Sequence, residues 1–141
     1  MPGRNPSRYR AGVASVETVS RIIAALPEVT EGERFGNLTW SVRRKAFAWD
    51  RPFSKADLRR FGDEPPPPGP ILAVRVADLA EKEAVLAAGG RAFFTIPHFD
   101  GYPAVLIQLD EVDETALREA LVDAWLACAP VTLAREYLGR E

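Results

Sequence analysis

The chain has 141 residues, of which 47% are hydrophobic and 27% are charged, and its formal net charge is −2. This is the size and composition of one globular domain with a substantial core, which excludes disorder of the whole chain. The small negative charge argues against a strongly basic nucleic-acid-binding protein. No segment approaches the roughly 18 apolar residues of a membrane span. The single cysteine, Cys128, cannot form an internal disulfide, so we expect a cytoplasmic protein without membrane contact.

Charge is distributed unevenly along the chain. Residues 1–60 have a balance of +6, whereas residues 61–141 have a balance of −8. Such a difference predicts one basic and one acidic region, provided that the fold keeps the two parts of the chain apart.

Prolines mark the boundaries of the segments in the first half of the chain. Residues 1–14 contain prolines and glycines with little apolar content, and we expect a flexible lead-in to a single domain over residues 15–141. Ser15 is suited to cap a first helix, whose apolar stripe ends before Pro27. Five prolines within residues 63–70 favour polyproline II, so this segment is expected to be an exposed loop inside the domain.

Apolar periodicity predicts the regular elements. Residues 38–42 alternate as a half-buried strand does, and residues 45–49 form its hairpin partner across Arg43 and Arg44, whose turn type stays open. The other elements follow in chain order: a short helix over 54–61, a strand over 71–76, a helix from Asp78 to Gly89, a short strand over 91–95, a strand over 104–109, a helix from Asp113 to Cys128, and a terminal helix after Pro130. This order predicts an α+β fold with a mainly antiparallel sheet and helices packed on one face.

Several short segments resemble a known family. They are Ala25–Glu31, the hairpin with Trp40 and Lys45–Ala48, the block Phe93–Pro103, Asp123–Leu126, and Leu133 with Ala134. Together they are similar to the MmcQ/YjbR family of small bacterial proteins, over about residues 16–138. The resemblance implies a double-wing fold reminiscent of frataxin-like proteins and a DNA-binding role. The proline-rich loop departs from the compact family pattern.

Basic residues supply the first candidate site. Arg43, Arg44 and Lys45 lie at the predicted hairpin turn. Four more basic residues follow: Arg51, Lys55, Arg59 and Arg60. A basic hairpin beside a basic short helix is suited to contact phosphates, which predicts a DNA-binding module. The simpler interpretation is a solvated turn and an ordinary exposed helix face.

The loop over residues 96–103 supplies the alternative site. His98, Asp100 and Tyr102 lie there, and Trp49 is the tryptophan least committed to the core, so these residues are candidates for contact with a small ligand. The simpler interpretation is that His98 and Asp100 stabilise a turn around Gly101. The proline-rich loop is a second candidate surface, for docking on a protein partner.

No group of residues has the spacing of a catalytic or metal site. Cys128 lies on the apolar stripe of its helix, where a thiol is normally inert. Asp113 and Glu114 suit the N-terminus of a helix better than a metal ion. We therefore expect a non-enzymatic binding module without metal or cofactor. A monomer is expected, and the homodimer stays open.

Overall fold

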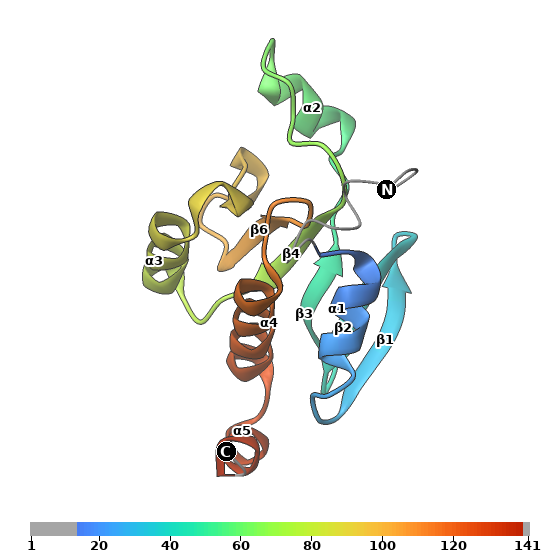
Figure 1. Cartoon of the computed structure of the whole chain (residues 1–141), viewed down its shortest axis with the longest axis vertical. Coiled ribbons are helices and arrows are strands. Elements are labelled where there is room, and N and C mark those ends of the chain that lie inside the picture. Colours follow the sequence, from blue (N-terminus) through green and yellow to red (C-terminus); the bar gives the residue numbers. More distant parts are fainter. Residues whose placement is uncertain (1–13, 140–141) are drawn as a thin grey trace, which may run out of the picture.

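The structure, a computed structural model, describes residues 14–139 and has an α+β architecture built on one antiparallel sheet (Figure 1). Its elements, in chain order, are α1 (Val16–Ile23), β1 (Val29–Arg34), β2 (Asn37–Val42), β3 (Lys45–Asp50), α2 (Lys55–Phe61), β4 (Ile71–Arg75), α3 (Leu79–Ala88), the 3-10 turn η2 (Gly90–Ala92), β5 (Phe93–Phe94), the 3-10 turn η3 (Pro97–Phe99), β6 (Ala104–Gln108), α4 (Glu114–Cys128) and α5 (Val131–Gly139). The lead-in expected over residues 1–14 lies outside the described residues except for Ala14. The small apolar side chain of Ala14 is buried in the core next to the first helix.

The sheet has six strands in the order β1-β2-β3-β4-β6-β5, and every neighbouring pair is antiparallel. β4 and β6 pair along five residues and are buried on both faces. Leu72 and Val74 of β4 face one apolar cluster, whereas Ile71 and Ala73 face another. The sheet therefore separates two cores of unequal size.

The larger core lies under α1, α3 and α4, which cover one face of the sheet (Figure 1). Ser15 caps α1 in a reciprocal capping box with Thr18, as the predicted start of this helix requires. The predicted stripe of α4 is confirmed, since Leu117, Leu121 and Trp125 are fully buried. Trp125 also donates a hydrogen bond from Nε1 to the carbonyl oxygen of Pro27 over 3.0 Å. This bond joins α4 to the end of the α1 segment.

The smaller core lies on the opposite face, where the sequence indicated no helix. Buried side chains of β4 and β6 meet Ile96 and Phe99 there, and Phe53 and Phe61 from the α2 region pack against them. Thus α2 and the η3 segment cover this face over β4 and β6. Within residues 14–139 no helix covers the same face of β1, β2 and β3, where Thr39, Ala46 and Trp49 line an open concavity.

Three local features differ from the sequence-based expectations. β1 was not predicted, because five of its six residues are exposed and it carries no apolar alternation. The strand expected over residues 91–95 is reduced to two residues, since η2 occupies its first part. The hairpin turn at Arg43 and Arg44 has φ values of 48° and 73°, the backbone of a two-residue type I′ turn that usually selects Asn-Gly. The proline-rich residues 63–70 form no helix or strand, as expected.

Candidate binding groove on the uncovered face of the sheet

A groove of about 440 Å³ lies at the border between the covered and uncovered parts of the sheet. Thr39 and Trp49, which are register partners in β2 and β3, form its floor together with Ala46. The remaining lining residues come from four segments: Arg34 and Phe35 at the β1–β2 turn, Asn37 at the start of β2, Asp50, Arg51, Pro52 and Ser54 after β3, and His98 and Tyr102 around η3. Residues from distant parts of the sequence therefore converge on this groove.

Aromatic rings form one wall of the groove, and the buried ring of Phe99 connects them. Trp49 lies nearly parallel to Phe99 with ring centroids 6.5 Å apart, and Tyr102 meets Phe99 edge-on at 5.8 Å. His98 lies 5.9 Å from the same ring. The ring of Tyr102 is 42% exposed, and the Arg75 guanidinium lies 5.5 Å from its centroid. The wall thus presents partly exposed rings in fixed positions.

Lys82 holds the backbone of this wall in place. This lysine of α3 is buried, and its Nζ donates to the carbonyl oxygens of Phe99 and Tyr102 over 2.6 and 2.8 Å. Burial lowers the pKa of Lys82, while the nearby carboxylate of Asp100 opposes the shift. Sequence reasoning did not find Lys82, because one lysine in a helix of mixed composition gives no signal of burial.

Arg51 closes one end of the groove and is itself fixed by Asp57. Its Nη1 donates to Oδ2 of Asp57 over 2.9 Å, and its guanidinium lies 5.5 Å from the Phe99 ring centroid. The Asp57 side chain is only 1% exposed and also accepts the backbone N–H of Ser54 over 2.9 Å. Burial acts to raise the pKa of Asp57, but the hydrogen bonds from Ser54 and Arg51 outweigh it and lower this pKa. Asp57, which completes the capping box of α2 with the N-cap Ser54, is therefore also the anchor of Arg51.

The hairpin-turn residues do not line the groove. Arg43, Arg44 and Lys45 are exposed at the start of β3, and Arg43 forms an ion pair with Glu28. Lys45 precedes Ala46 of the groove floor, and Arg43 and Arg44 share a neighbouring concavity with Arg34. Arg51 lies beyond the other end of β3, and the six steps from Lys45 at about 3.3 Å each place it roughly 20 Å away.

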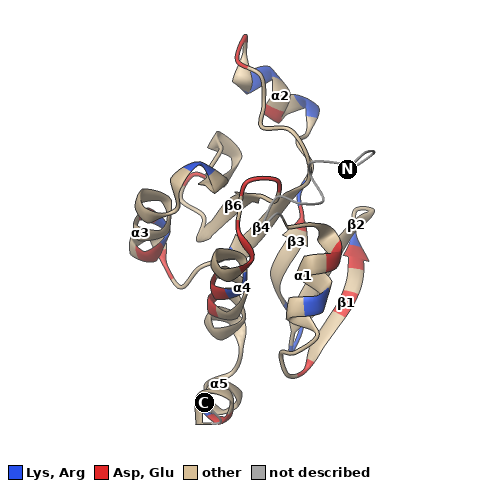
Figure 2. Ribbon diagram, viewed as in Figure 1, with Lys and Arg blue, Asp and Glu red and all other residues tan. Residues whose placement is uncertain are grey.

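The basic residues of α2 lie beside the Arg51 end. Lys55, Arg59 and Arg60 are exposed, and Arg60 comes within 3.9 Å of Asp57. In Figure 2 the blue Lys and Arg positions of α2 lie beyond one end of β3, and those of the hairpin turn lie at its other end. The seven basic candidates therefore form two groups, and only Arg51 lines the groove.

The alternative candidate set is largely brought together. Trp49, His98 and Tyr102 line the groove side by side with Arg51, and a depression of about 310 Å³ is formed by these four residues and Phe99. Asp100 lines neither concavity and lies where its charge acts on Lys82. Arg34, Phe35 and Thr39 were not anticipated as site residues. The missing signal was β1, since without that strand nothing placed the Phe35 turn beside β3.

Two other side chains named from the sequence are structural. Trp40 is buried and donates from Nε1 to Oε1 of Glu31 over 3.0 Å. Cys128 is buried, and burial raises the pKa of its thiol, which keeps it in the unreactive protonated form. Within residues 14–139 no cluster of three or more His, Cys, Asp or Glu side chains could hold a metal ion. No helix in this range is long and apolar enough to span a membrane.

The fold and the groove define a small α+β domain with one covered and one partly open sheet face, and comparison with known proteins gives its family. The YjbR family model matches residues 24–127, and the chain belongs to this family. It is 43% identical over 130 residues to the uncharacterized protein Rv2570 of Mycobacterium tuberculosis and equally to the uncharacterized protein Mb2600 of Mycobacterium bovis. Each alignment covers 90% of this chain and 98% of the relative.

A solved structure has a similar fold. The crystal structure of the Deinococcus radiodurans protein DR2400, with the family-model domain DUF419, matches with a TM-score of 0.57 at 18% identity. The match covers 83% of this chain and 80% of that protein. At this identity the likeness supports the six-stranded α+β architecture and nothing further.

Proposed function

We propose that the chain is a non-enzymatic nucleic-acid-binding module and that it binds a single strand in the groove over β2 and β3. The observation that carries the proposal is the convergence of Trp49, Arg51, His98 and Tyr102 on one open groove. Proteins that bind single strands combine aromatic rings, on which bases stack, with cationic side chains along the backbone path. Both kinds of side chain are present, and they come from segments that only the fold brings together.

Two arginines make the groove favourable for contact with phosphate. Arg34 pairs with Asn37 at the start of β2, and Arg51 follows the end of β3 on the other side of β2, so both lie at the same end of these three strands. Asp57 offsets part of the charge of Arg51, so we assign Arg34 a larger share of any phosphate contact. Phe35 stands beside Arg34 fully exposed, at a φ of 53° that a non-glycine residue rarely adopts. An exposed ring held at a turn in this conformation suits contact with a base.

A single strand suits this geometry better than a duplex. Duplex binding depends on a continuous basic surface for phosphates, whereas the two basic groups of this chain lie at opposite ends of β3. The aromatic rings of the groove can stack only on a base that is not already stacked within a nucleic-acid duplex.

The decisive experiment measures fluorescence anisotropy of a labelled oligonucleotide of about 12 nucleotides, within the range of about 4–16 nucleotides bound by single-strand folds. A duplex of the same sequence is the matched control. We expect the single strand to bind more tightly than the duplex, with affinity that falls as salt rises from about 50 to 200 mM. Absence of single-strand binding at the lowest salt would remove the nucleic-acid assignment.

Neutralising the hairpin turn separates the groove from the first sequence-based site. The triple variant Arg43→Gln, Arg44→Gln and Lys45→Gln changes residues that lie roughly 20 Å or more from Arg51 along β3. We expect it to bind the oligonucleotide nearly as well as the unmodified chain. The double variant Arg34→Gln and Trp49→Ala should bind at least tenfold more weakly, since it removes a phosphate contact and a stacking surface. The reverse ranking would move the site to the hairpin.

A small planar anion is the second candidate ligand, and the local character of the groove favours it. The aromatic rings and Arg51 line one small depression. In the described residues no continuous row of Lys and Arg runs from this depression along β3 (Figure 2). A fluorescently labelled nucleoside monophosphate tests this alternative by direct titration in the same anisotropy assay. Saturable binding of the monophosphate without any binding of the strand would favour a small-ligand module.

A further inference from the structure

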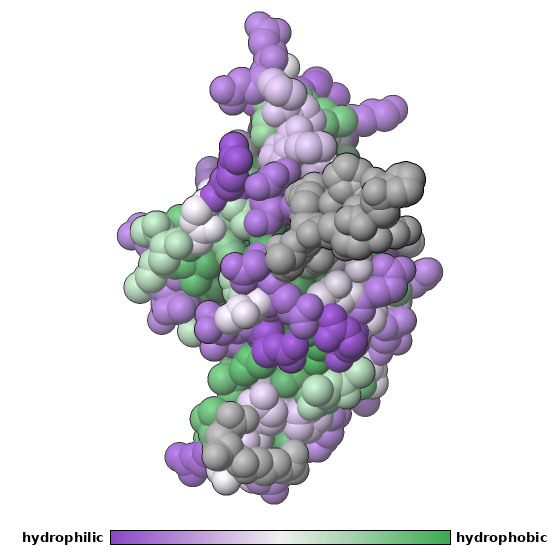
Figure 3. Space-filling model, in the orientation of Figure 1, coloured by the Kyte–Doolittle hydropathy of each residue, from purple (hydrophilic) through white to green (hydrophobic). Residues whose placement is uncertain are grey.

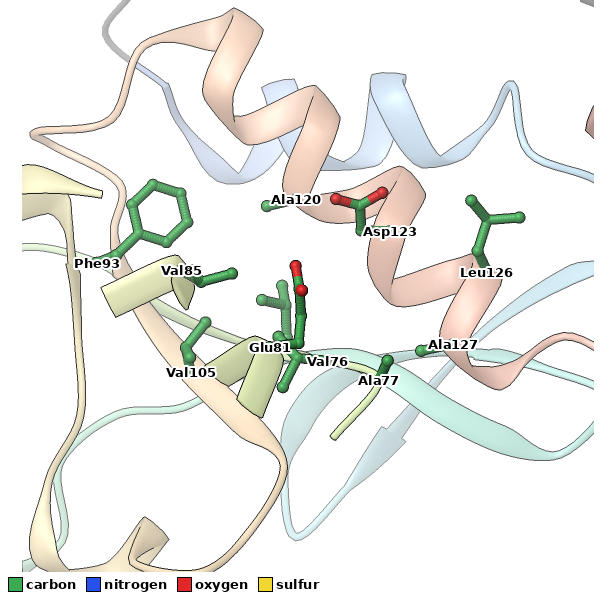
Figure 4. Close-up of a pocket in the computed structure, with 11 residues that line it drawn as sticks. Val76, Ala77, Glu81, Val85, Phe93, Val105, Ala120, Asp123, Leu126 and Ala127 are labelled. Atoms are coloured by element: carbon green, nitrogen blue, oxygen red, sulfur yellow. The ribbon is translucent and has the colours of Figure 1, made fainter. Parts of the chain in front are cut away.

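A second concavity, which we call the acidic cleft, lies between α3 and α4 on the covered face of the sheet (Figure 4). Its volume is about 300 Å³, at the lower end of the range for small-molecule sites. The walls are apolar and come from Val76, Val85, Phe93, Val105 and Leu126. None of these residues belongs to the groove, so the cleft is an independent site.

Small residues keep the cleft from being filled. Ala120 and Ala127 of α4 face it, where a longer side chain would occupy the space (Figure 4). Gly89 follows α3, and a Cβ there would lie 2.6 Å from the side chain of Phe93. Glycine at this position therefore lets Phe93 pack against the end of α3 as the end wall. On the face shown in Figure 3, hydrophobic surface gathers over α3.

Two carboxylates are the ionisable groups that line this apolar space. Glu81 projects from α3 and Asp123 from α4 into the same region between the helices (Figure 4). Neither forms an ion pair with a Lys or Arg side chain of residues 14–139. Partial burial raises the pKa of Asp123, and the charges of Glu81 and Glu119 add to the shift. Both residues are exposed, and each carboxylate lies close enough for its charge to act on the other. Like charges beside apolar surface are unfavourable until a cation lies near both.

We propose that the acidic cleft binds a small ammonium compound, with its apolar body against Val85 and Phe93 and its charged nitrogen between Glu81 and Asp123. The apolar walls stabilise a hydrocarbon or aromatic body through burial. The two carboxylates accept charge-assisted hydrogen bonds from the ammonium group. An anion is repelled by both carboxylates, and a neutral molecule of the same shape leaves them without a partner.

The test is a titration of the full chain, uniformly labelled with ¹⁵N, with 2-phenylethylamine followed by amide chemical shifts. Its neutral isostere 2-phenylethanol and the anion 3-phenylpropionate are the matched probes. We expect the amine to shift the amides around residues 74–77, 81–85 and 120–127 in a saturable way, and the two other probes to bind at least tenfold more weakly. Equal affinity for the amine and the alcohol would overturn the role of the carboxylates. No shift with any probe in a folded sample would overturn the site.

Variants assign the shifts to the cleft. Asp123→Asn and Glu81→Gln should each weaken amine binding about tenfold, which corresponds to about 1.4 kcal/mol. Ala120→Leu should abolish binding by filling the cavity while both carboxylates stay in place. Glu83→Gln removes an exposed α3 carboxylate that does not line the cleft and should bind the amine as the unmodified chain does. Equal weakening by Glu83→Gln would reduce the effect to general charge and overturn the proposal.

Discussion

The groove and the acidic cleft lie on opposite faces of one sheet and differ in both charge and chemistry. The groove is lined by aromatic rings, by the guanidinium groups of Arg34 and Arg51 and by the carboxylate of Asp50, whereas the cleft has apolar walls and two carboxylates. A net charge of −2 conceals this separation. The two proposals together assign an anion-binding surface to one face of the sheet and a cation-binding surface to the other.

One element connects the two sites. α3 contributes Glu81 to the cleft, and the next residue, Lys82, extends to the carbonyl groups behind the groove wall. Substitutions that act on one site and spare the other therefore test whether the two are independent. The expected effects are ordered below from the largest to the smallest.

Asp57→Ala should have the largest effect, and it should act on the groove side alone. The substitution leaves the half-buried Arg51 without its carboxylate and removes the acceptor of the Ser54 N–H. Breaking a buried ion pair by removing one partner destabilises by about 3–5 kcal/mol, and we expect about 3 kcal/mol less free energy of unfolding in urea.

The difference in free energy of unfolding between Asp57→Ala and the unmodified chain should become smaller in acid. The pKa of Asp57 is lowered in the folded state, so its contribution is complete at neutral pH and is lost as the pH falls through that lowered pKa. Arg60→Gln is the matched control, because Arg60 is half exposed and 3.9 Å from the same carboxylate. A loss of less than 1 kcal/mol for Asp57→Ala would mean that Arg51 is not anchored as described.

Lys82→Met should have the next largest effect. It removes two hydrogen bonds from a charged donor to buried backbone carbonyls, each worth about 1.5–3 kcal/mol before the packing of the methionine offsets part of the loss. We expect a net destabilisation of about 2 kcal/mol and weaker oligonucleotide binding, because residues 99–102 lose their support. Amine binding in the cleft should persist.

The control for Lys82→Met is Lys55→Met, at an exposed position of α2, which should leave the free energy of unfolding within about 0.5 kcal/mol. If Lys82→Met altered amine affinity as strongly as oligonucleotide affinity, the two sites would be coupled through α3 rather than independent.

Tyr102→Ala should weaken oligonucleotide binding about tenfold, since one stacked base contributes about 1–3 kcal/mol. The side chain is partly exposed, so the loss of folding stability should be smaller than the loss of affinity. Tyr102→Phe keeps the ring and should bind nearly as tightly as the unmodified chain. Anisotropy titrations of both variants test the prediction, and equal affinity of Tyr102→Ala and Tyr102→Phe would exclude stacking at this position.

Most of the helices and strands could be predicted from local sequence signals such as helix caps and apolar periodicity. Ser15, Ser54, Asp78 and Asp113 each accept a hydrogen bond from the third residue of the helix that they precede, as their positions in the sequence predicted. β1 gave no such signal, because an exposed edge strand needs neither apolar alternation nor a cap. This segment is recognised as a strand only from its antiparallel pairing with β2.

The second core and the groove depend on contacts that no single segment encodes. Phe53 and Phe61 of the α2 region pack with Phe94 and Phe99, which lie more than 30 residues further along the chain, against β4 and β6. The sequence named the loop over residues 96–103 and Trp49 as candidate contact residues, and in the structure His98 and Tyr102 line one depression with Trp49. Lys82 and Arg34 were not found, since burial of the first and the turn beside the second are tertiary properties.

Asp123→Asn should have the smallest effect on stability. The substitution should stabilise the fold slightly while it weakens binding of the amine. Since the pKa of Asp123 is raised in the folded state, the ionised carboxylate is unfavourable there, and stability is lost as the pH rises through that raised pKa. The asparagine variant should therefore be more stable than the unmodified chain at neutral pH, by a few tenths of a kcal/mol after allowance for solvent screening.

The higher stability of Asp123→Asn should disappear in acid, where Asp123 of the unmodified chain is protonated in the folded and the unfolded state. Urea unfolding of both proteins at several pH values measures this difference. The same variant should bind the amine more weakly. A residue that destabilises the free protein and is needed for a ligand is expected at a binding site. A variant that was less stable and bound equally well would instead make Asp123 a structural residue of α4.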